Sequence, residues 1–335
     1  MNRAAIVVLN WNGIQDTLLC LDSLLQQTYD DYHIVVVDNG SNMNDVRQLE
    51  DYQKQNTDII SVIYNKKNLG FAGGVNTGIR WALKNSYSHI ALFNNDALAK
   101  KEWLSSLMTA IKANKTGIAT GLLLHQDGKT IDSSGDWYSK WGLPFPRNRG
   151  DHTVFASKDG FVFGASGGAT LYKSELFNDI GLFDEDFFAY YEDVDISFRA
   201  QLAGWKVAYT STAVAYHKQG ATSSKIPGFT VYQTFKNLPW LFIKNVPLRL
   251  ALSIGVHFYT AYTLMFWNAV LHGSGWSAFK GVLKSILLTP KKISERQYIQ
   301  KKNRVSSSYI KNMLWDDLPP DQTGLRKLRK KITGK

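Results

Sequence analysis

Residues 4–42 read AAIVVLNWNGIQDTLLCLDSLLQQTYDDYHIVVVDNGSN and hold two strand-like runs around one helical segment. The runs at residues 5–9 and 34–37 are short, continuous and rich in Val and Ile, which is typical of strands buried on both faces. Between them, Leu18, Leu21 and Leu25 recur at helical spacing. A strand, a helix and a second strand in this order predict a parallel pair with a helical crossover.

The same alternation continues along the chain. Further strand-like runs lie at residues 59–64 and 89–93, and Val75, Ile79 and Leu83 follow helical spacing between them. Repeated units of this kind predict an α/β fold with a mostly parallel sheet flanked by helices.

Polar residues follow each of the four predicted strands. Parallel sheets bind ligands at the carboxyl ends of their strands, so these residues predict a polar ligand crevice. The alternative is that Asn, Asp and Gly simply form turns and helix caps there. The residues are Asn10 and Asn12 after the first strand, residues 38–41 after the second, Asn65 and Asn68 after the third, and Asn94, Asn95 and Asp96 after the fourth.

Two common nucleotide-binding motifs are absent. The turn after the first predicted strand, Asn10 to Gly13, contains one glycine, so it lacks the dinucleotide fingerprint. The sequence has no G-x-x-x-x-G-K-[ST] segment either. The glycine-rich segment, residues 70–78, follows the third strand and alone is weak evidence for a ligand site.

The segment FDEDFFAYYEDVDISFRAQLAGW, residues 183–205, concentrates carboxylates among aromatic residues at a predicted helix start. A carboxylate beside aromatic surface loses water and becomes more basic, as a general base requires. The alternative is that these acids only complement the helix dipole. For Asp195 we expect a structural ion pair, because Arg199 follows four residues later.

Charge is distributed unevenly. The net charge is +11, but residues 221–335 hold 19 Lys and Arg against 4 Asp and Glu, and the rest of the chain is slightly acidic. A basic, aromatic tail favours an anionic membrane surface over nucleic acid as partner.

Cys20 is the only cysteine, which excludes an intrachain disulfide and a cysteine metal cluster. The first apolar run is too short for a signal peptide, so we expect the catalytic part to stay in the cytoplasm.

Residues 250–279 contain no Lys, Arg, Asp or Glu. A span needs ~20 apolar residues, but a polar stripe through Ser253, His257 and Thr260 favours a helix that lies in the membrane interface. Lysines follow from Lys280 onward. A spanning helix, a buried helical hairpin and a homo-oligomer interface are the alternatives.

Several segments in fixed order resemble the family-2 glycosyltransferases with the GT-A fold, especially the bacterial rhamnosyltransferase-like branch. They are VVLNWNG from Val7, VVVDNGSN from Val35, NLGFAGGVNTGI from Asn68, LFNND from Leu92, GASGGATLYKSELF from Gly164, and the acidic segment from Phe183. The resemblance runs from about residue 4 to about residue 220.

The resemblance implies a role for individual residues. Asp193, paired with Glu192, stands where similar inverting enzymes carry the catalytic base. Asp96 and His217 stand at the position of the metal ligands, for Mg²⁺ or Mn²⁺, although Asn94 and Asn95 leave only one carboxylate there. The implied substrate-binding residues are Asn10, Asn12, Asp38, Asn68, Gly70, Gly74, Asn76, Asn95 and Gly168.

The resemblance also implies an activity. It is the inverting transfer of a sugar, with L-rhamnose from dTDP-rhamnose favoured. A membrane-facing tail on such an enzyme suggests a lipid-linked acceptor, so we expect a polyprenyl-diphosphate-linked saccharide in cell-wall polysaccharide or O-antigen synthesis. A UDP-linked galactofuranose, glucose or N-acetylhexosamine donor stays open, as does an inactive sugar-nucleotide-binding scaffold. We expect a catalytic domain over residues 1–225 and membrane-associating amphipathic helices with a basic tail over residues 226–335, at the cytoplasmic face of the membrane.

Overall fold

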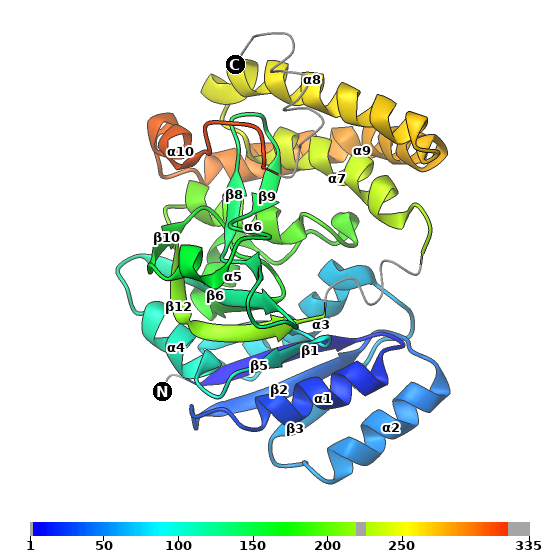
Figure 1. The fold of residues 1–335 in the computed structure, drawn as a ribbon, viewed down its shortest axis with the longest axis vertical. Helices are drawn as coiled ribbons and strands as arrows, with labels where there is room; N and C mark the ends of the chain where they lie inside the picture. Colours follow the sequence, from blue (N-terminus) through cyan, green and yellow to red (C-terminus); the bar gives the residue numbers. More distant parts are fainter. Residues whose placement is uncertain (1–2, 219–225, 321–335) are drawn as a thin grey trace.

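A computed structural model describes residues 3–218 and 226–320. Figure 1 shows a mixed sheet with helices packed against it, and a layer of C-terminal helices that crosses the far end of the molecule. The last part of the predicted basic tail, residues 321–335, lies outside the described residues.

The N-terminal half of the sheet is parallel. Its strands are β1 (Ala4–Asn10), β2 (Tyr32–Asp38), β3 (Ile60–Tyr64) and β4 (His89–Asn94), in the spatial order β3-β2-β1-β4. The crossover helices are α1 (Ile14–Leu24), α2 (Met43–Lys54) and α3 (Gly70–Lys84). These strands and helices confirm the predicted alternation, and they bring the four polar strand ends to one edge.

The second half of the sheet is mixed. Beyond β4 follow β11 (Ala169–Lys173), β6 (Thr116–His125), β12 (Lys206–His217) and β10 (Gly160–Val162). The strand β6 runs parallel to β12, and β11 runs antiparallel to both β4 and β6. Short strands β5 (Ala97–Ala99) and β7 (Ile131–Ser133) pair with β12 and β6. Helices α4 (Trp103–Ala110), α5 (Ser174–Ile180) and α6 (Glu192–Leu202) pack around this half.

Residues 132–162 hold several short elements. They are the end of β7, the hairpin β8 (Asp136–Tyr138) and β9 (Pro144–Pro146), the 3₁₀ turn η1 (Thr153–Ala156), and β10. A second 3₁₀ turn, η2 (Glu185–Phe187), lies in the acidic segment. Strands of three residues leave no clear period-2 pattern, which explains why the sequence does not reveal them.

The glycine-rich segment forms the first half of α3 and is not a loop. A Cβ on Gly78 would lie 2.4 Å from the Val7 side chain, and a Cβ on Gly74 would lie 2.4 Å from the Leu9 side chain. The glycines therefore let α3 approach β1 closely, which is the role of close helix packing that glycines often serve.

The C-terminal layer consists of α7 (Phe229–Asn245), α8 (Leu248–Leu271), α9 (Gly275–Lys301) and α10 (Ser307–Met313). Buried Trp240, Leu241 and Phe258 of this layer share one apolar cluster with Phe187 and Phe198 of the acidic segment. The cluster joins the layer to the part of the molecule that carries the acidic segment. The domain boundary at residues 225 and 226 remains a prediction, and residue 225 lies outside the described residues.

Candidate active site

The ends of β1 and β2 are joined by an amide and carboxylate network. The Asn10 amide donates to Asp38 Oδ1 at 2.9 Å, and Asn10 Oδ1 accepts from the Thr17 hydroxyl at 2.8 Å. Asn95, from the end of β4, donates to Thr17 Oγ1 at 2.9 Å. The structure therefore brings together Asn10, Asp38 and Asn95, which the sequence places 28 to 85 residues apart.

Two of the predicted substrate-binding residues carry local structure as well. Asp38 Oδ2 accepts the backbone N–H of Ser41 at 3.0 Å, which is the turn interaction that the sequence offers as the alternative role of Asp38. Asn12 has a φ of 51° and its Oδ1 accepts the backbone N–H of Asn42 at 2.9 Å. Asp38 is buried and Asn12 is exposed. Among these two, Asn12 is the more accessible to a ligand.

Asn39, which the sequence analysis does not single out, is the centre of the next group. Its amide donates to Asn68 Oδ1 and to the Gly70 carbonyl, both at 3.0 Å, and its Oδ1 accepts from Asn65 at 3.1 Å. The Asn68 Oδ1 also accepts the Gly70 N–H at 2.7 Å. Asn68 and Gly70 thus lie beside the end of β2, where Asn39 orients them. The only sequence signal for Asn39 was its place between Asp38 and Gly40.

Asn76 has a structural use that the resemblance does not indicate. It is buried, its amide donates to the Phe183 carbonyl at 2.8 Å and to Glu185 Oε1 at 3.0 Å, and its Oδ1 accepts the Phe183 N–H at 3.1 Å. These bonds attach α3 to the start of the acidic segment. They commit the side chain of Asn76 to the protein, and Gly74 packs against Leu9. Direct contact of these two with the donor stays a prediction.

Asp96 and His217 form the candidate metal centre. His217 Nε2 lies 3.0 Å from Asp96 Oδ1, and His217 Nδ1 lies 2.7 Å from Asp132 Oδ2. Burial alone would lower the pKa of His217, but its hydrogen bonds to Asp132 and Asp96 and their negative charges outweigh it and raise that pKa to about 9. The protonated imidazole thus balances two carboxylates, and a divalent cation would take the place of its Nε2 proton, because histidine ligates a metal only through a deprotonated ring nitrogen.

The donor set fits a divalent cation. The Asp96 oxygen and the His217 nitrogen are close enough to share one ion, and Asp132 orients the imidazole from its other nitrogen, as carboxylates commonly do at metal-bound histidines. Asp132 is 2% exposed in its side chain and also binds Arg149 Nη2 at 2.8 Å. The sequence analysis missed Asp132 because it lies 85 residues from His217.

One glycine loop connects the metal centre to the candidate base. The Asn94 N–H, two residues before Asp96, donates to the Gly168 carbonyl at 2.8 Å. The neighbouring Gly167 N–H donates to Asp193 Oδ2 at 3.0 Å. Gly168 therefore lies between the candidate metal centre and Asp193, because the backbone of residues 167 and 168 bonds to both parts of the site.

The carboxylates of the acidic segment fall into two groups. Four have cationic partners: Asp184 and Asp186 bind Lys292 at 2.7 Å each, Glu185 binds Arg80 at 2.6 Å, and Asp195 binds Arg199 at 2.8 Å. The last pair confirms the ion pair expected from the sequence. Among the described residues, no ion pair involves Glu192 or Asp193. These two are therefore the carboxylates whose charge is left for chemistry.

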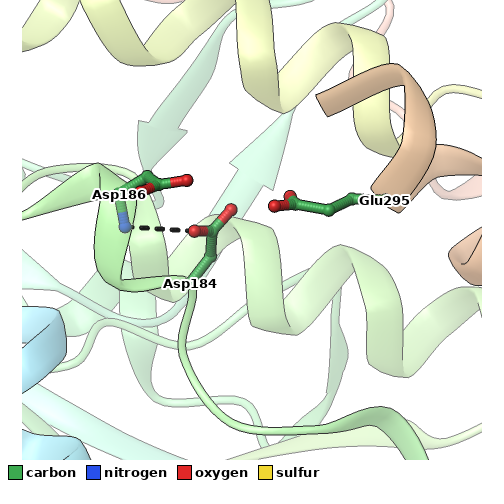
Figure 2. Close-up of side chains that lie close together, drawn as sticks. All are labelled: Asp184, Asp186 and Glu295. Carbon is green, nitrogen blue, oxygen red and sulfur yellow. Dashed lines mark hydrogen bonds between the residues drawn. The ribbon is translucent and has the colours of Figure 1, made fainter. Parts of the chain in front are cut away.

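A second acidic group resembles a metal site but holds lysines. Figure 2 shows Asp184, Asp186 and Glu295 with their carboxylates turned toward one another. The ammonium of Lys292 lies between them, 2.7 Å from Asp184, 2.7 Å from Asp186 and 3.1 Å from Glu295. Because this buried ammonium contacts all three carboxylates, and Lys244 and Lys291 supply further positive charge, the group is an ion-pair cluster that attaches α9 to the acidic segment.

Burial tunes the two unpaired acids. It raises the pKa of Asp193, although N–H donation from Gly167 and Val194 offsets part of this effect. Burial and the neighbouring Asp193 raise the pKa of Glu192 well above its usual range. Glu192 is 6% exposed, whereas Asp193 keeps more contact with solvent. Asp193 is thus the carboxylate that an acceptor can reach.

A further carboxylate at the site, Asp136 of β8, was not predicted. Its backbone N–H and carbonyl pair with Gly164 at 2.8 and 3.1 Å, which holds it beside the glycine loop. Burial and the charge of Asp193 raise the pKa of Asp136 well above its usual range, and Arg149 opposes this effect. Asp136, Asp193 and Arg149 therefore sense one another's charge.

Residues 5–181 match the model of the family described as Glycosyl transferase family 2. The chain belongs to this family. This glycosyltransferase is 25% identical over 243 residues to the low-salt glycan biosynthesis hexosyltransferase Agl10 of Haloferax volcanii, which covers 71% of this chain and 74% of that protein. It is 25% identical to the dTDP-rhamnosyl transferase RfbF of Shigella flexneri over 66% of this chain and 74% of that one.

A shorter match, 36% identical over 62 residues, links the glycosyltransferase to the N-acetylglucosaminyl-diphospho-decaprenol L-rhamnosyltransferase of Mycobacterium tuberculosis, with 18% of this chain and 20% of that protein covered. Among solved structures, it is similar to the mannosyltransferase PcManGT of Pyrobaculum calidifontis in complex with GDP-Man and Mn²⁺, with a TM-score of 0.52, 14% identity, and 94% and 88% of the two chains covered. This likeness confirms the predicted GT-A fold.

Proposed function

We propose that the glycosyltransferase moves L-rhamnose from dTDP-rhamnose, with inversion, to a saccharide linked to a polyprenyl diphosphate. The pairing of the Asp96–His217 centre with Asp193 across one glycine loop carries this proposal. The name of RfbF supports the donor, and the name of the mycobacterial relative supports both the sugar and the lipid-linked acceptor. UDP-linked galactofuranose, glucose and N-acetylhexosamine remain alternative donors.

In the proposed reaction, Asp193 accepts the proton of the acceptor hydroxyl. The hydroxyl oxygen attacks the anomeric carbon from the face opposite the diphosphate, the bond from that carbon to the phosphate oxygen breaks, and the nucleoside diphosphate leaves. One displacement inverts the configuration, so a single base and a stabilised leaving group suffice.

Asp96 and His217 would hold Mg²⁺ or Mn²⁺. When bound, such an ion supplies Lewis-acid neutralisation of the diphosphate. Asp132 keeps Nε2 of His217 turned toward Asp96, and Arg149, whose side chain is 45% exposed, adds positive charge near Asp132 and Asp193. A solved relative of the same fold contains Mn²⁺ with a nucleotide sugar, which supports this choice of ion.

We further propose that α8 and α9 dock on an anionic membrane, at the cytoplasmic face. The helix Leu248–Leu271 is long and apolar enough to cross a membrane, and 28% of its most apolar 18-residue stretch is buried. Large exposed apolar side chains gather on both helices, and exposed lysines follow on α9. The apolar set is Leu248, Leu252, Val256, Tyr259, Trp267, Val270, Leu271, Trp276, Phe279, Leu283, Ile286, Leu287, Ile293 and Tyr298.

The activity is tested with purified protein, vesicles that contain a polyprenyl-diphosphate-linked N-acetylglucosamine, and a panel of nucleotide sugars with Mg²⁺, Mn²⁺ or EDTA. The expected result is transfer from dTDP-rhamnose that needs the cation and is abolished by Asp193→Asn. Transfer from another donor alone would refute the choice of rhamnose. Nucleotide-sugar binding without transfer from any donor would favour the inactive scaffold.

The membrane surface is tested by flotation with vesicles of phosphatidylcholine with or without phosphatidylglycerol. We expect binding that grows with the anionic lipid and falls in Leu252→Glu and Trp276→Glu, at positions that are 81% and 69% exposed. The control is Val154→Glu, at an exposed apolar residue on the catalytic part. Equal flotation of all variants would contradict docking through α8 and α9.

A further inference from the structure

The turn that leads into Glu192 and Asp193 has an unfavourable backbone conformation. Phe188, Tyr190 and Tyr191 have φ values of 65°, 71° and 71°, in a region that residues with a Cβ rarely adopt. Such a conformation persists only where the surrounding contacts impose it, and it occurs often at functional sites. The question is therefore which contacts hold residues 187–191.

Asn237 of α7 makes contacts that hold this turn. Its amide nitrogen donates to the carbonyls of Phe187 at 3.0 Å, Ala189 at 2.9 Å and Tyr190 at 2.8 Å. Its side chain is fully buried. Three carbonyls that converge on one amide must point inward together, which the left-handed residues make possible.

The Asn237 carbonyl oxygen is buried and has no hydrogen-bond partner among the described residues. A buried oxygen without a partner is unfavourable, so the oxygen is not what favours asparagine here. The donors on the amide nitrogen are the useful part of the side chain. Within the part of the chain that the structure describes, the hydrogen bonds of the amide nitrogen all go to the turn.

The opposite side of the turn faces the donor end of the site. The Phe188 carbonyl accepts the N–H of Ala72 at 3.1 Å, and a Cβ on Gly70 would lie 2.4 Å from that carbonyl oxygen. At its end, the Tyr191 carbonyl accepts the Asp195 N–H at 2.9 Å and so starts α6. The turn thus lies between the N-terminus of α3 and α7. Its backbone path determines where α6 starts and therefore where Asp193 lies.

We propose that Asn237 is a positioning residue for sugar transfer, which presents Asp193 to the acceptor by holding the turn 187–191. This inference rests on the proposed role of Asp193 as the base. Asn237 touches no reacting group, and it acts through the backbone of the turn. It also makes α7, which packs between the acidic segment and α9, part of the catalytic apparatus.

The test compares Asn237→Leu and Asn237→Asp with Gln300→Leu. Leucine keeps the size of Asn237 without donors, and aspartate keeps the shape without donors when it is ionised. Gln300 is the matched control, because its amide donates to the carbonyls of Lys244 and Asn245 at 3.3 and 3.0 Å, away from the turn. The donor dissociation constant with Mn²⁺, kcat, KM and Tm are measured, and kcat is normalised to the titrated donor-binding sites.

We expect both Asn237 variants to lose about 100-fold in kcat, because a displacement of ~1 Å at a reacting group costs this much, with donor affinity within about threefold. Gln300→Leu should keep kcat within about twofold of wild type, even if its Tm falls as much as the Tm of the Asn237 variants. Normalisation means that partial unfolding lowers the number of sites and not kcat. An Asn237 variant with kcat within about threefold of wild type would overturn the inference. An active Asp193→Asn enzyme would instead overturn the assignment of Asp193 as the base.

Discussion

Replacing Lys292 with Met is the sharpest test of the ion-pair cluster that attaches α9 to the acidic segment. Lys292 is fully buried, and its ammonium lies 2.7 Å from Asp184, 2.7 Å from Asp186 and 3.1 Å from Glu295. Met fills nearly the same volume without charge. The variant therefore leaves three carboxylates around a site that has lost its central cation.

Breaking a buried ion pair by removing one partner costs about 3–5 kcal/mol. Here Asp186 and Glu295 are 25% and 29% exposed, and Lys244 still binds Asp184 at 2.5 Å, so water and a second ammonium soften the loss. We expect a loss of about 3 kcal/mol in the free energy of unfolding. Lys291→Met is the control, since Lys291 is 56% exposed and its pair with Asp186 is worth ~1 kcal/mol or less.

The assay is urea unfolding followed by circular dichroism at pH 7 and at lower pH. Burial would raise the pKa of Asp184 and of Asp186, but the lysine ammoniums outweigh it and hold both pKa values below the usual range. A carboxylate with a lowered pKa in the folded state stabilises the protein above its ordinary pKa of about 4 and loses this effect as pH falls through the lowered value. The difference between wild type and Lys292→Met should therefore be largest at neutral pH and narrow below about pH 4.

An equal loss of stability in the Lys291 and Lys292 variants would refute the buried cluster. A difference between wild type and Lys292→Met that stays constant down to about pH 2 would refute its electrostatic origin.

The remaining predictions concern the site itself. Asp193→Asn should lower kcat by at least about 10³-fold with donor affinity nearly unchanged, whereas Glu192→Gln should lower kcat less, because Glu192 is buried. Rapid-quench assays at saturating donor measure both losses, and similar losses in the two variants would contradict the choice of Asp193. Asp132→Asn should weaken Mn²⁺ activation about 10–100-fold while keeping nucleotide binding, as measured by metal titration of activity, and an unchanged metal requirement would rule out its role behind His217. Because burial raises the pKa of Asp193, kcat should fall with decreasing pH already above the ordinary aspartate range, since the base works only when ionised; a kcat constant down to about pH 4 would contradict this.

Much of the fold and part of the site can be predicted from the sequence because their signals are local. Four short Val- and Ile-rich runs predict the parallel half of the sheet. Because parallel strands end at the same edge and ligands bind there, the sequence also predicts that Asn10, Asp38 and Asn95 lie close together at a ligand site. The spacing of Asp195 and Arg199 predicts their ion pair, because four residues make one helical turn. Family resemblance adds Asp96, His217 and Asp193, whose roles remain to be tested.

Only the tertiary structure decides which distant groups meet. Asp132 lies beside His217 and Lys292 among the acids of residues 184–186 because strands and helices far apart in sequence pack together, and no periodicity records such a pairing. The same packing divides the carboxylates of one segment into those neutralised by lysine or arginine and the two, Glu192 and Asp193, that no ion pair in the described residues neutralises. Desolvation and charge depend on neighbours in space, so the chemistry of these acids is a property of the folded chain.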